Sequence, residues 1–243
     1  MLNSLFISEI NIDWGKISND SYLHSIGSIK NLNQLVLHKP ITFFTGENGS
    51  GKSTILEAIA VAYGLNPEGG SKNFNFYTHN THSELCNAIT LCKGVKRVKD
   101  SFFLRAESFY NVASMVDEYS MGESSFFDRY GGKSLHEQSH GESFLNLILE
   151  RFSSDSLYIL DEPEAALSPQ RQLSVLSQIH HLSQKGTQFI IASHSPILLG
   201  IPNSEILSFD GNKIVPIDYF STESYKVTEL FINHKDILLN QLL

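Results

Sequence analysis

Short apolar runs bounded by polar turns recur along the chain, and such runs predict β-strands. We expect strands at residues 5–12, 35–37, 41–45, 102–106, 157–160 and 188–192. Longer apolar-rich segments without an internal helix breaker predict helices at residues 54–63, 143–152, 169–183 and 227–242. Strands that alternate with helices in this way are typical of an α/β protein.

The order of elements near the C-terminal end predicts how the strands pair. The helix at 169–183 joins the strands at 157–160 and 188–192, and such a βαβ unit connects parallel strands through a right-handed crossover. Further on, Asp210-Gly211-Asn212 is typical of a hairpin turn between apolar runs at 206–209 and 213–215. The sheet is therefore expected to be mixed.

Turn-rich sequence indicates where regular structure is interrupted. Residues 65–101 are predicted to be loop and irregular structure, and a Gly- and Ser-rich patch at 121–133 is predicted to be flexible. We therefore expect a single domain over residues 1–243, with flanking helices and an inserted irregular and helical subdomain at about 65–155.

Composition narrows the class of protein. The 243 residues include 18 basic and 26 acidic side chains, for a net charge of −8, so no global basic field favours nucleic acid. Two cysteines, Cys86 and Cys92, argue against a disulfide framework and suit a reducing compartment. The sequence contains neither a basic signal region nor a long apolar run, so we expect a cytoplasmic protein without membrane insertion.

A glycine-rich run follows the expected strand at 41–45 and leads directly into the helix at 54–63. It consists of Gly46, Glu47, Asn48, Gly49, Ser50, Gly51, Lys52, Ser53 and Thr54, and it fits the P-loop pattern G-x-x-x-x-G-K-[ST]. This arrangement points backbone N–H groups and the helix dipole at one phosphate. Lys52 is expected to contact the β- and γ-phosphates, and Ser53 to bind Mg²⁺. The run predicts a nucleoside triphosphate site that also binds Mg²⁺.

Acidic residues at the end of the strand at 157–160 complete the expected metal site. Asp161 is expected to hold Mg²⁺ together with Ser53, and Glu162 to orient and deprotonate the attacking water. His194 follows the next strand, where its side chain could hydrogen-bond the γ-phosphate and the water. These roles predict Lys52, Glu162 and His194 as catalytic residues.

A second phosphate-binding feature lies between the P-loop and Asp161. Ser139 and Gly141 come at the start of the helix that continues through residue 152, and a serine and a glycine at a helix N-terminus suit an anion. Ser139 could equally be a simple helix cap. Because the chain already has one phosphate cradle, the second indicates a site for another subunit's nucleotide.

The order of these motifs resembles that of ABC-type ATPases, in the soluble SMC- and RecF-like branch. Still closer is the resemblance to a family of small bacterial predicted ATPases, carried by residues 46–54, 66–76, 102–111, 134–144, 157–172 and 188–199. The resemblance implies a head-to-tail dimer with two ATP molecules between the subunits. Ser139, Gly141 and Glu142 would then contact the partner's nucleotide, and Ser168 would lie near the dimer contact.

This sequence departs from the common Leu-Ser-Gly-Gly-Gln signature at Gln138, His140 and Glu142. The glutamine that the family places after a strand to sense Mg²⁺ also has no obvious counterpart, and Glu107 stands in its expected position. Glu107 is therefore expected to bind the metal; the alternative is an ion pair with Arg105 or another basic residue. No aromatic residue is marked out to stack on adenine, and the candidates are Trp14 and Tyr22.

Three functional classes remain open at this point. The first is an ATPase that hydrolyses ATP to ADP and phosphate in a head-to-tail homodimer and acts as a nucleotide-dependent switch. The second is a slow-turnover, nucleotide-gated module that presents its dimer to a nuclease, another effector or DNA. The third is the ATPase subunit of a membrane transporter, which the imperfect signature makes the weakest of the three.

Overall fold

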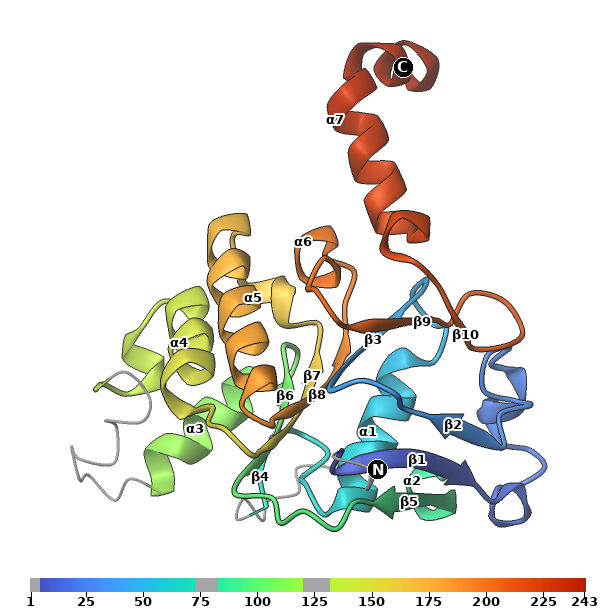
Figure 1. Ribbon diagram of the computed structural model, residues 1–243, viewed down its shortest axis with the longest axis vertical. Coiled ribbons are helices and arrows are strands. Elements are labelled where there is room, and N and C mark those ends of the chain that lie inside the picture. The colour runs from blue at the N-terminus through green and yellow to red at the C-terminus, as the bar shows by residue number, and fades with distance from the viewer. Residues whose placement is uncertain (1–4, 73–82, 120–131) are drawn as a thin grey trace.

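The computed structural model describes residues 5–72, 83–119 and 132–243, and its main sheet has the strand order β10-β9-β3-β8-β7-β6-β4 (Figure 1). In that order the strands are Val215–Pro216, Glu205–Ser208, Ile41–Thr45, Gln188–Ala192, Leu157–Asp161, Ser101–Arg105 and Gly70–Ser71. β3 pairs in parallel with β8 and β9, and β7 pairs in parallel with β6 and β8. The edge strands β4 and β10 are antiparallel. The expected mixed sheet is confirmed.

Helices cover both faces of this sheet. They are α1 (Lys52–Tyr63), α2 (Leu85–Ala88), α3 (Phe109–Tyr119), α4 (His140–Asn146), α5 (Pro169–Gln184), α6 (Pro196–Leu199) and α7 (Glu223–Leu242). A π-helical turn, Leu147–Arg151, extends α4. Short 3-10 turns occupy Trp14–Lys16, Tyr22–Ser25, Leu135–Glu137, Pro163–Ala166 and Tyr219–Ser221.

Neighbouring residues of the central strands point to opposite faces and build separate cores. Phe44 and Ile159 pack with Ile55 of α1 on one face. Phe43 and Leu160 pack with buried side chains of α5 on the other. Strands buried on both faces must be apolar at every position, which explains why β3, β7 and β8 read as uninterrupted apolar runs.

A smaller sheet with the order β2-β1-β5 lies against α1 and corrects one prediction. Its strands are Gln34–Val36, Ile7–Ile12 and Ile89–Lys93. Residues 65–101 were predicted to be irregular, but they contain β4, α2 and β5. β5 pairs antiparallel with β1, with Ile10 opposite Leu91. Because one face of this strand is exposed, polar residues interrupt its apolar run, and the sequence does not reveal it as a strand.

Helix boundaries differ from the predictions in the segment between β6 and β7. α3 follows β6 and was not predicted, and α4 begins at His140, three residues before the expected start. The Gly- and Ser-rich patch predicted at 121–133 falls mostly outside the described residues. The hairpin around Asp210 is confirmed by the antiparallel pairing of β9 with β10.

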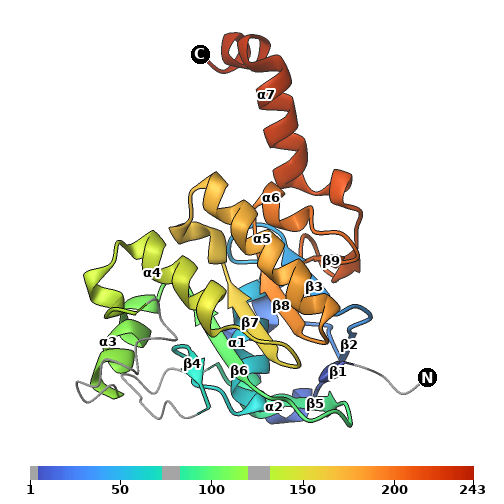
Figure 2. The same ribbon diagram turned by 60° about the vertical axis from the view of Figure 1, so that its left-hand side comes forward.

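The C-terminal helix α7 projects away from the body of the molecule (Figures 1 and 2). It begins at Glu223, four residues earlier than predicted, and its backbone is kinked at His234. No residue of α7 is buried, and Ile232 and Ile237 are 72% and 60% exposed. Across the described ranges, we find no helix with the length and apolar character that crossing a membrane requires.

Candidate nucleotide-binding site

The P-loop connects β3 to α1 through backbone that only glycine adopts easily. Gly46, Gly49 and Gly51 have φ angles of 143°, 80° and 95°. Gly51 is also enclosed, because a Cβ atom there would lie 2.5 Å from Ile29 Cδ1 and 2.9 Å from Ile26 Cγ2. The loop can therefore wrap closely at a point where any side chain would clash.

Two contacts from distant segments hold the loop in place. The backbone N–H of Glu47 donates to Asp210 Oδ1 at 2.8 Å, and the hydroxyl of Ser28 donates to the carbonyl oxygen of Ser50 at 2.5 Å. Asp210 was expected only to form a hairpin turn. Its second role could not be read from the sequence, because it depends on β9 pairing beside β3.

Lys52 turns its ammonium group back into the loop. Its Nζ donates to the carbonyl oxygens of Gly46 at 2.6 Å and Glu47 at 2.9 Å, and the residue is buried. Burial lowers the pKa of Lys52, whereas the nearby carboxylates, with Glu162 first, act to raise it. A phosphate group that enters the loop therefore meets a desolvated cation.

Ser53 and Asp161 lie together where the sequence predicts the metal. The hydroxyl of Ser53 donates to Asp161 Oδ1 at 3.0 Å, and Asp161 is only 5% exposed. Burial raises the pKa of Asp161 to about 6, although the charge of Arg105 opposes this shift. A hydroxyl and a buried carboxylate at this distance are hard oxygen donors that suit Mg²⁺.

Arg105 lies among three carboxylates, two of them predicted site residues, and was not itself predicted as a functional residue. Its guanidinium lies 2.8 Å from Glu57, 3.5 Å from Asp161 and 3.6 Å from Glu107. The residue ends β6 directly opposite Asp161 in the register of β7. Glu107, expected to bind the metal, is 85% exposed at its side chain and makes the ion pair that was its alternative role.

Glu162 and His194 face each other beyond the metal site. His194 Nε2 lies 3.8 Å from Glu162 Oε1. Glu162 has φ 51° and ψ 52°, a left-handed conformation that is unusual for a residue other than glycine and costs about 1–2 kcal/mol. Strain of this kind often marks a functional position.

A pocket of about 520 Å³ brings Lys52, Ser53, Glu107 and Glu162 together, whereas His194 lines a separate pocket with Gly46, Glu47 and Asp210. The first pocket is lined by Tyr22, Ile26, Asn48, Gly49, Gly51, Lys52, Ser53, Thr54, Glu107 and Glu162. Tyr22 is 56% exposed, whereas Trp14 donates its ring N–H to the carbonyl oxygen of Leu32 and does not line this pocket. Of the two aromatic candidates, Tyr22 is the one beside the P-loop.

Ser139 and Gly141 lie elsewhere, at the start of α4. In Figure 1, α4 and α1 lie apart, because α1 packs on one face of the main sheet and α4 packs with α5 on the other. Ser139 and Glu142 are exposed, and the hydroxyl of Ser139 donates to Glu142 Oε2 at 2.7 Å. A Cβ atom at Gly141 would lie 2.5 Å from Arg171 Nη1 and 2.7 Å from the carbonyl oxygen of Ala166. The glycine therefore lets the start of α4 pack against the segment that leads into α5.

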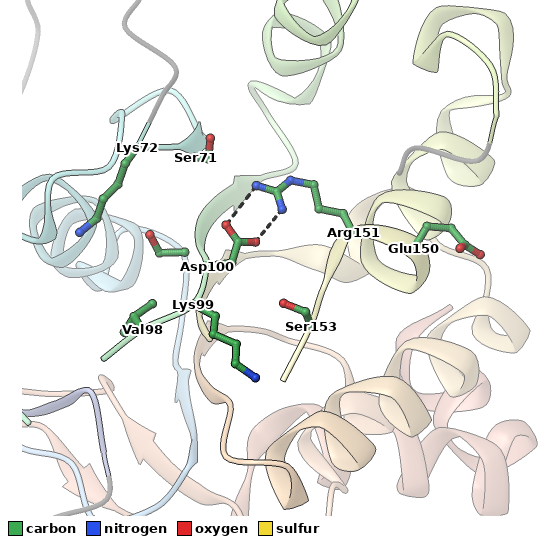
Figure 3. Close-up of a pocket in the computed structure, with 9 residues that line it drawn as sticks. Ser71, Lys72, Val98, Lys99, Asp100, Glu150, Arg151 and Ser153 are labelled. Atoms are coloured by element: carbon green, nitrogen blue, oxygen red, sulfur yellow. Dashed lines mark hydrogen bonds and ion pairs between the residues drawn. The ribbon is translucent and has the colours of Figure 1, made fainter. Parts of the chain in front are cut away.

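A pocket of about 640 Å³ lies near the amino ends of β6 and β7, away from the P-loop (Figure 3). Arg151 crosses it and donates to both carboxylate oxygens of Asp100, at 2.6 and 3.2 Å. Lys72 and Lys99 also line it. Its arginine is thus paired with a carboxylate, and no glycine-rich loop of the described ranges lines this pocket as it does the one beside Lys52.

Comparison with known proteins agrees with this geometry. A family model described as "AAA domain" matches residues 22–184, more than half of the chain. The chain is 24% identical over 235 residues to the phosphate import ATP-binding protein PstB 1 of Streptococcus agalactiae, covering 88% of this chain and 90% of that protein. It is 24% identical to ABC transporter G family member 1 of Dictyostelium discoideum, covering 83% of this chain but only 28% of that protein.

Solved structures resemble the fold at lower sequence identity. CbiO1 of Clostridium perfringens, described as part of an ABC transporter complex, aligns with a TM-score of 0.50 and 13% identity, covering 98% of this chain and all of that one. The SMC head domain of Thermotoga maritima aligns with a TM-score of 0.46 and 16% identity over 88% of this chain. With the family match, the P-loop geometry leads to one assignment: the chain belongs to the AAA domain family and is an ATP-hydrolysing enzyme.

Proposed function

We propose that the pocket beside the P-loop binds Mg-ATP and hydrolyses it to ADP and phosphate. Lys52 exchanges the carbonyl oxygens of Gly46 and Glu47 for phosphate oxygens. Glu162 orients and deprotonates the attacking water, and His194, 3.8 Å away, stabilises the γ-phosphoryl group as charge develops on it. Ser53 and Asp161 would hold Mg²⁺, which when bound neutralises phosphate charge.

Hydrolysis is proposed to require a second copy of the chain in a head-to-tail dimer. The observation that carries this proposal is the position of Ser139, exposed at the start of α4, which packs on the face of the main sheet opposite to α1. A helix start with a serine and a glycine suits a phosphate, but its own nucleotide is out of reach. The partner's ATP would satisfy it, so that ATP joins the subunits and hydrolysis releases them.

Size-exclusion chromatography with light scattering on Glu162→Gln tests the dimer directly. This variant keeps the shape of the side chain but removes the proposed base, so bound ATP should accumulate. We expect a monomer without nucleotide and a dimer with Mg-ATP. Adding Ser139→Arg should abolish the dimer while leaving ATP binding unchanged, because the arginine would lie at the partner's phosphate. A Glu162→Gln variant that binds ATP but stays monomeric would refute the homodimer.

The transporter class is a second candidate, and a relative that spans most of the chain favours it. The phosphate import ATP-binding protein covers 88% of this chain, although at only 24% identity. A transporter subunit should sediment with membranes in complex with a permease. If the protein expressed from its own genome remains entirely in the aqueous fraction after gentle lysis, this candidate is rejected.

A further inference from the structure

Glu164 lies in the 3-10 turn after Asp161 and holds the segment that carries His194. One of its oxygens, Oε1, accepts hydrogen bonds from the hydroxyl of Ser193 at 2.9 Å, the backbone N–H of His194 at 2.5 Å and that of Ser195 at 3.1 Å. All three donors belong to consecutive residues. A single carboxylate therefore fixes the backbone on both sides of the histidine.

The imidazole of His194 is not held in place by a strong contact of its own. Its Nε2 is buried without a hydrogen-bond partner among the described residues, and the nearest carboxylate, Glu162, is 3.8 Å away. The position of the ring must then come from the backbone that carries it. On the far side, the hydroxyl of Ser195 donates to Gln172 Oε1 at 2.6 Å and caps α6, so the segment is tied at both ends.

We propose that Glu164 is a positioning residue for ATP hydrolysis, which sets the place of His194 through the backbone and does not itself contact the nucleotide. This inference rests on the proposed role of His194. Because reacting groups must be placed within a fraction of an ångström, a shift of about 1 Å can lower the rate on the order of 100-fold. Loss of Glu164 should therefore reduce the rate of the chemical step and leave the affinity for ATP nearly intact.

Glu205 provides a matched control in the same sheet. Its Oε1 also accepts from two backbone N–H groups, of His38 at 2.8 Å and Lys39 at 3.1 Å, and from the hydroxyl of Thr42 at 2.7 Å. These contacts lie at the amino ends of β3 and β9, whereas the P-loop follows the carboxyl end of β3. Glu205→Ala should therefore remove a comparable set of hydrogen bonds without disturbing hydrolysis.

The test measures kcat and KM for ATP in Glu164→Ala, His194→Ala, the double variant and Glu205→Ala. We expect Glu164→Ala to lower kcat about tenfold or more with KM within about twofold, since misplacement acts on the chemical step. If Glu164 acts only through His194, the double variant should match His194→Ala within about twofold. Glu205→Ala should keep the wild-type kcat.

Three results would overturn the inference. The first is a normal kcat in Glu164→Ala when His194→Ala is impaired. The second is a double variant whose loss is the product of the single losses, which would mean that Glu164 acts separately. The third is an unimpaired His194→Ala, which refutes the role of His194 and with it this inference, whereas an absence of ATP turnover in the wild-type protein would refute the proposed function itself. Glu164→Gln keeps an acceptor oxygen and should recover most of the rate. If Glu164→Ala does not fold, Glu164→Asp retracts the carboxylate by one methylene and gives the same comparison.

Discussion

Replacing Gly51 with alanine should destabilise the protein more than the same change at Gly49, because only Gly51 is enclosed. Both glycines have positive φ angles, 95° and 80°. An added Cβ would lie 2.5 Å from Ile29 Cδ1 at Gly51, whereas nothing lies within 4 Å at Gly49. The comparison therefore separates packing from backbone strain.

The expected free energies follow from these contacts. A left-handed backbone conformation costs an alanine about 1–2 kcal/mol at either position. Alanine also lowers the conformational entropy of the unfolded chain, by the same amount in both variants. At Gly51, pushing a methyl group into Ile29 adds about 1–3 kcal/mol. Glycine-to-alanine at Gly51 should thus lower the free energy of unfolding by about 1–3 kcal/mol more than at Gly49.

Urea titration followed by circular dichroism measures this difference, provided that the variants share one m-value. Ile29→Val supplies an internal check, because it removes the Cδ1 atom that the new methyl group would meet. Its combination with Gly51→Ala should be less destabilised than the sum of the two single variants. Equal losses for Gly51→Ala and Gly49→Ala would refute the packing argument and leave backbone strain as the whole effect.

Further predictions concern Asp161 and its surroundings. Burial raises the pKa of Asp161 to about 6 from 3.8. The folded protein therefore favours the protonated carboxyl: relative to higher pH, Asp161 stabilises the fold fully below about pH 4, and this stabilisation is lost as the pH rises through about 6. Asp161→Asn should therefore raise the free energy of unfolding by about 1–3 kcal/mol at pH 8 but not at pH 4 in urea titrations; an equal effect at both pH values contradicts this. Arg105 lowers the pKa of Asp161, so Arg105→Gln should shift the loss of Mg²⁺ binding on acidification to higher pH in calorimetric titrations. An unchanged midpoint would show that the two charges are not coupled in solution. Chelating Mg²⁺ with EDTA should abolish ATP turnover in a phosphate-release assay, and restored turnover on adding excess Mg²⁺ is the control.

The parts of the fold that could be predicted from the sequence are strands buried on both faces and positions where the backbone requires a positive φ angle. β7 and β8 are buried on both faces, so every position is apolar and the strand is evident. Gly51 requires a positive φ angle, which the P-loop spacing already implies. By contrast, β5 exposes most of its positions, and its apolar residues gain meaning only when paired with β1, roughly 80 residues earlier in the chain.

The site residues that were missed share a different cause. Arg105 acts on Asp161 because β6 lies beside β7 in a register that no local pattern reveals. Glu164 looks like an ordinary polar residue after the strand, and its role appears only when the segment from Ser193 to Ser195 is folded against it. Asp210 likewise reaches Glu47 across a gap of 163 positions in sequence. Local motifs name the groups that touch a ligand, whereas the residues that support those groups come from distant segments.

The hydrogen bonds of Lys52 to carbonyl oxygens of its own loop have a consequence for ligand selectivity. Because its ammonium group donates to two carbonyl oxygens of the loop, a ligand must compete with those dipoles to contact it. A neutral hydroxyl or carbonyl offers no more than the loop already supplies. A phosphate oxygen carries formal charge and makes the stronger hydrogen bond. The P-loop is therefore expected to favour charged ligands, and a neutral analogue with the size of a phosphate should bind more weakly.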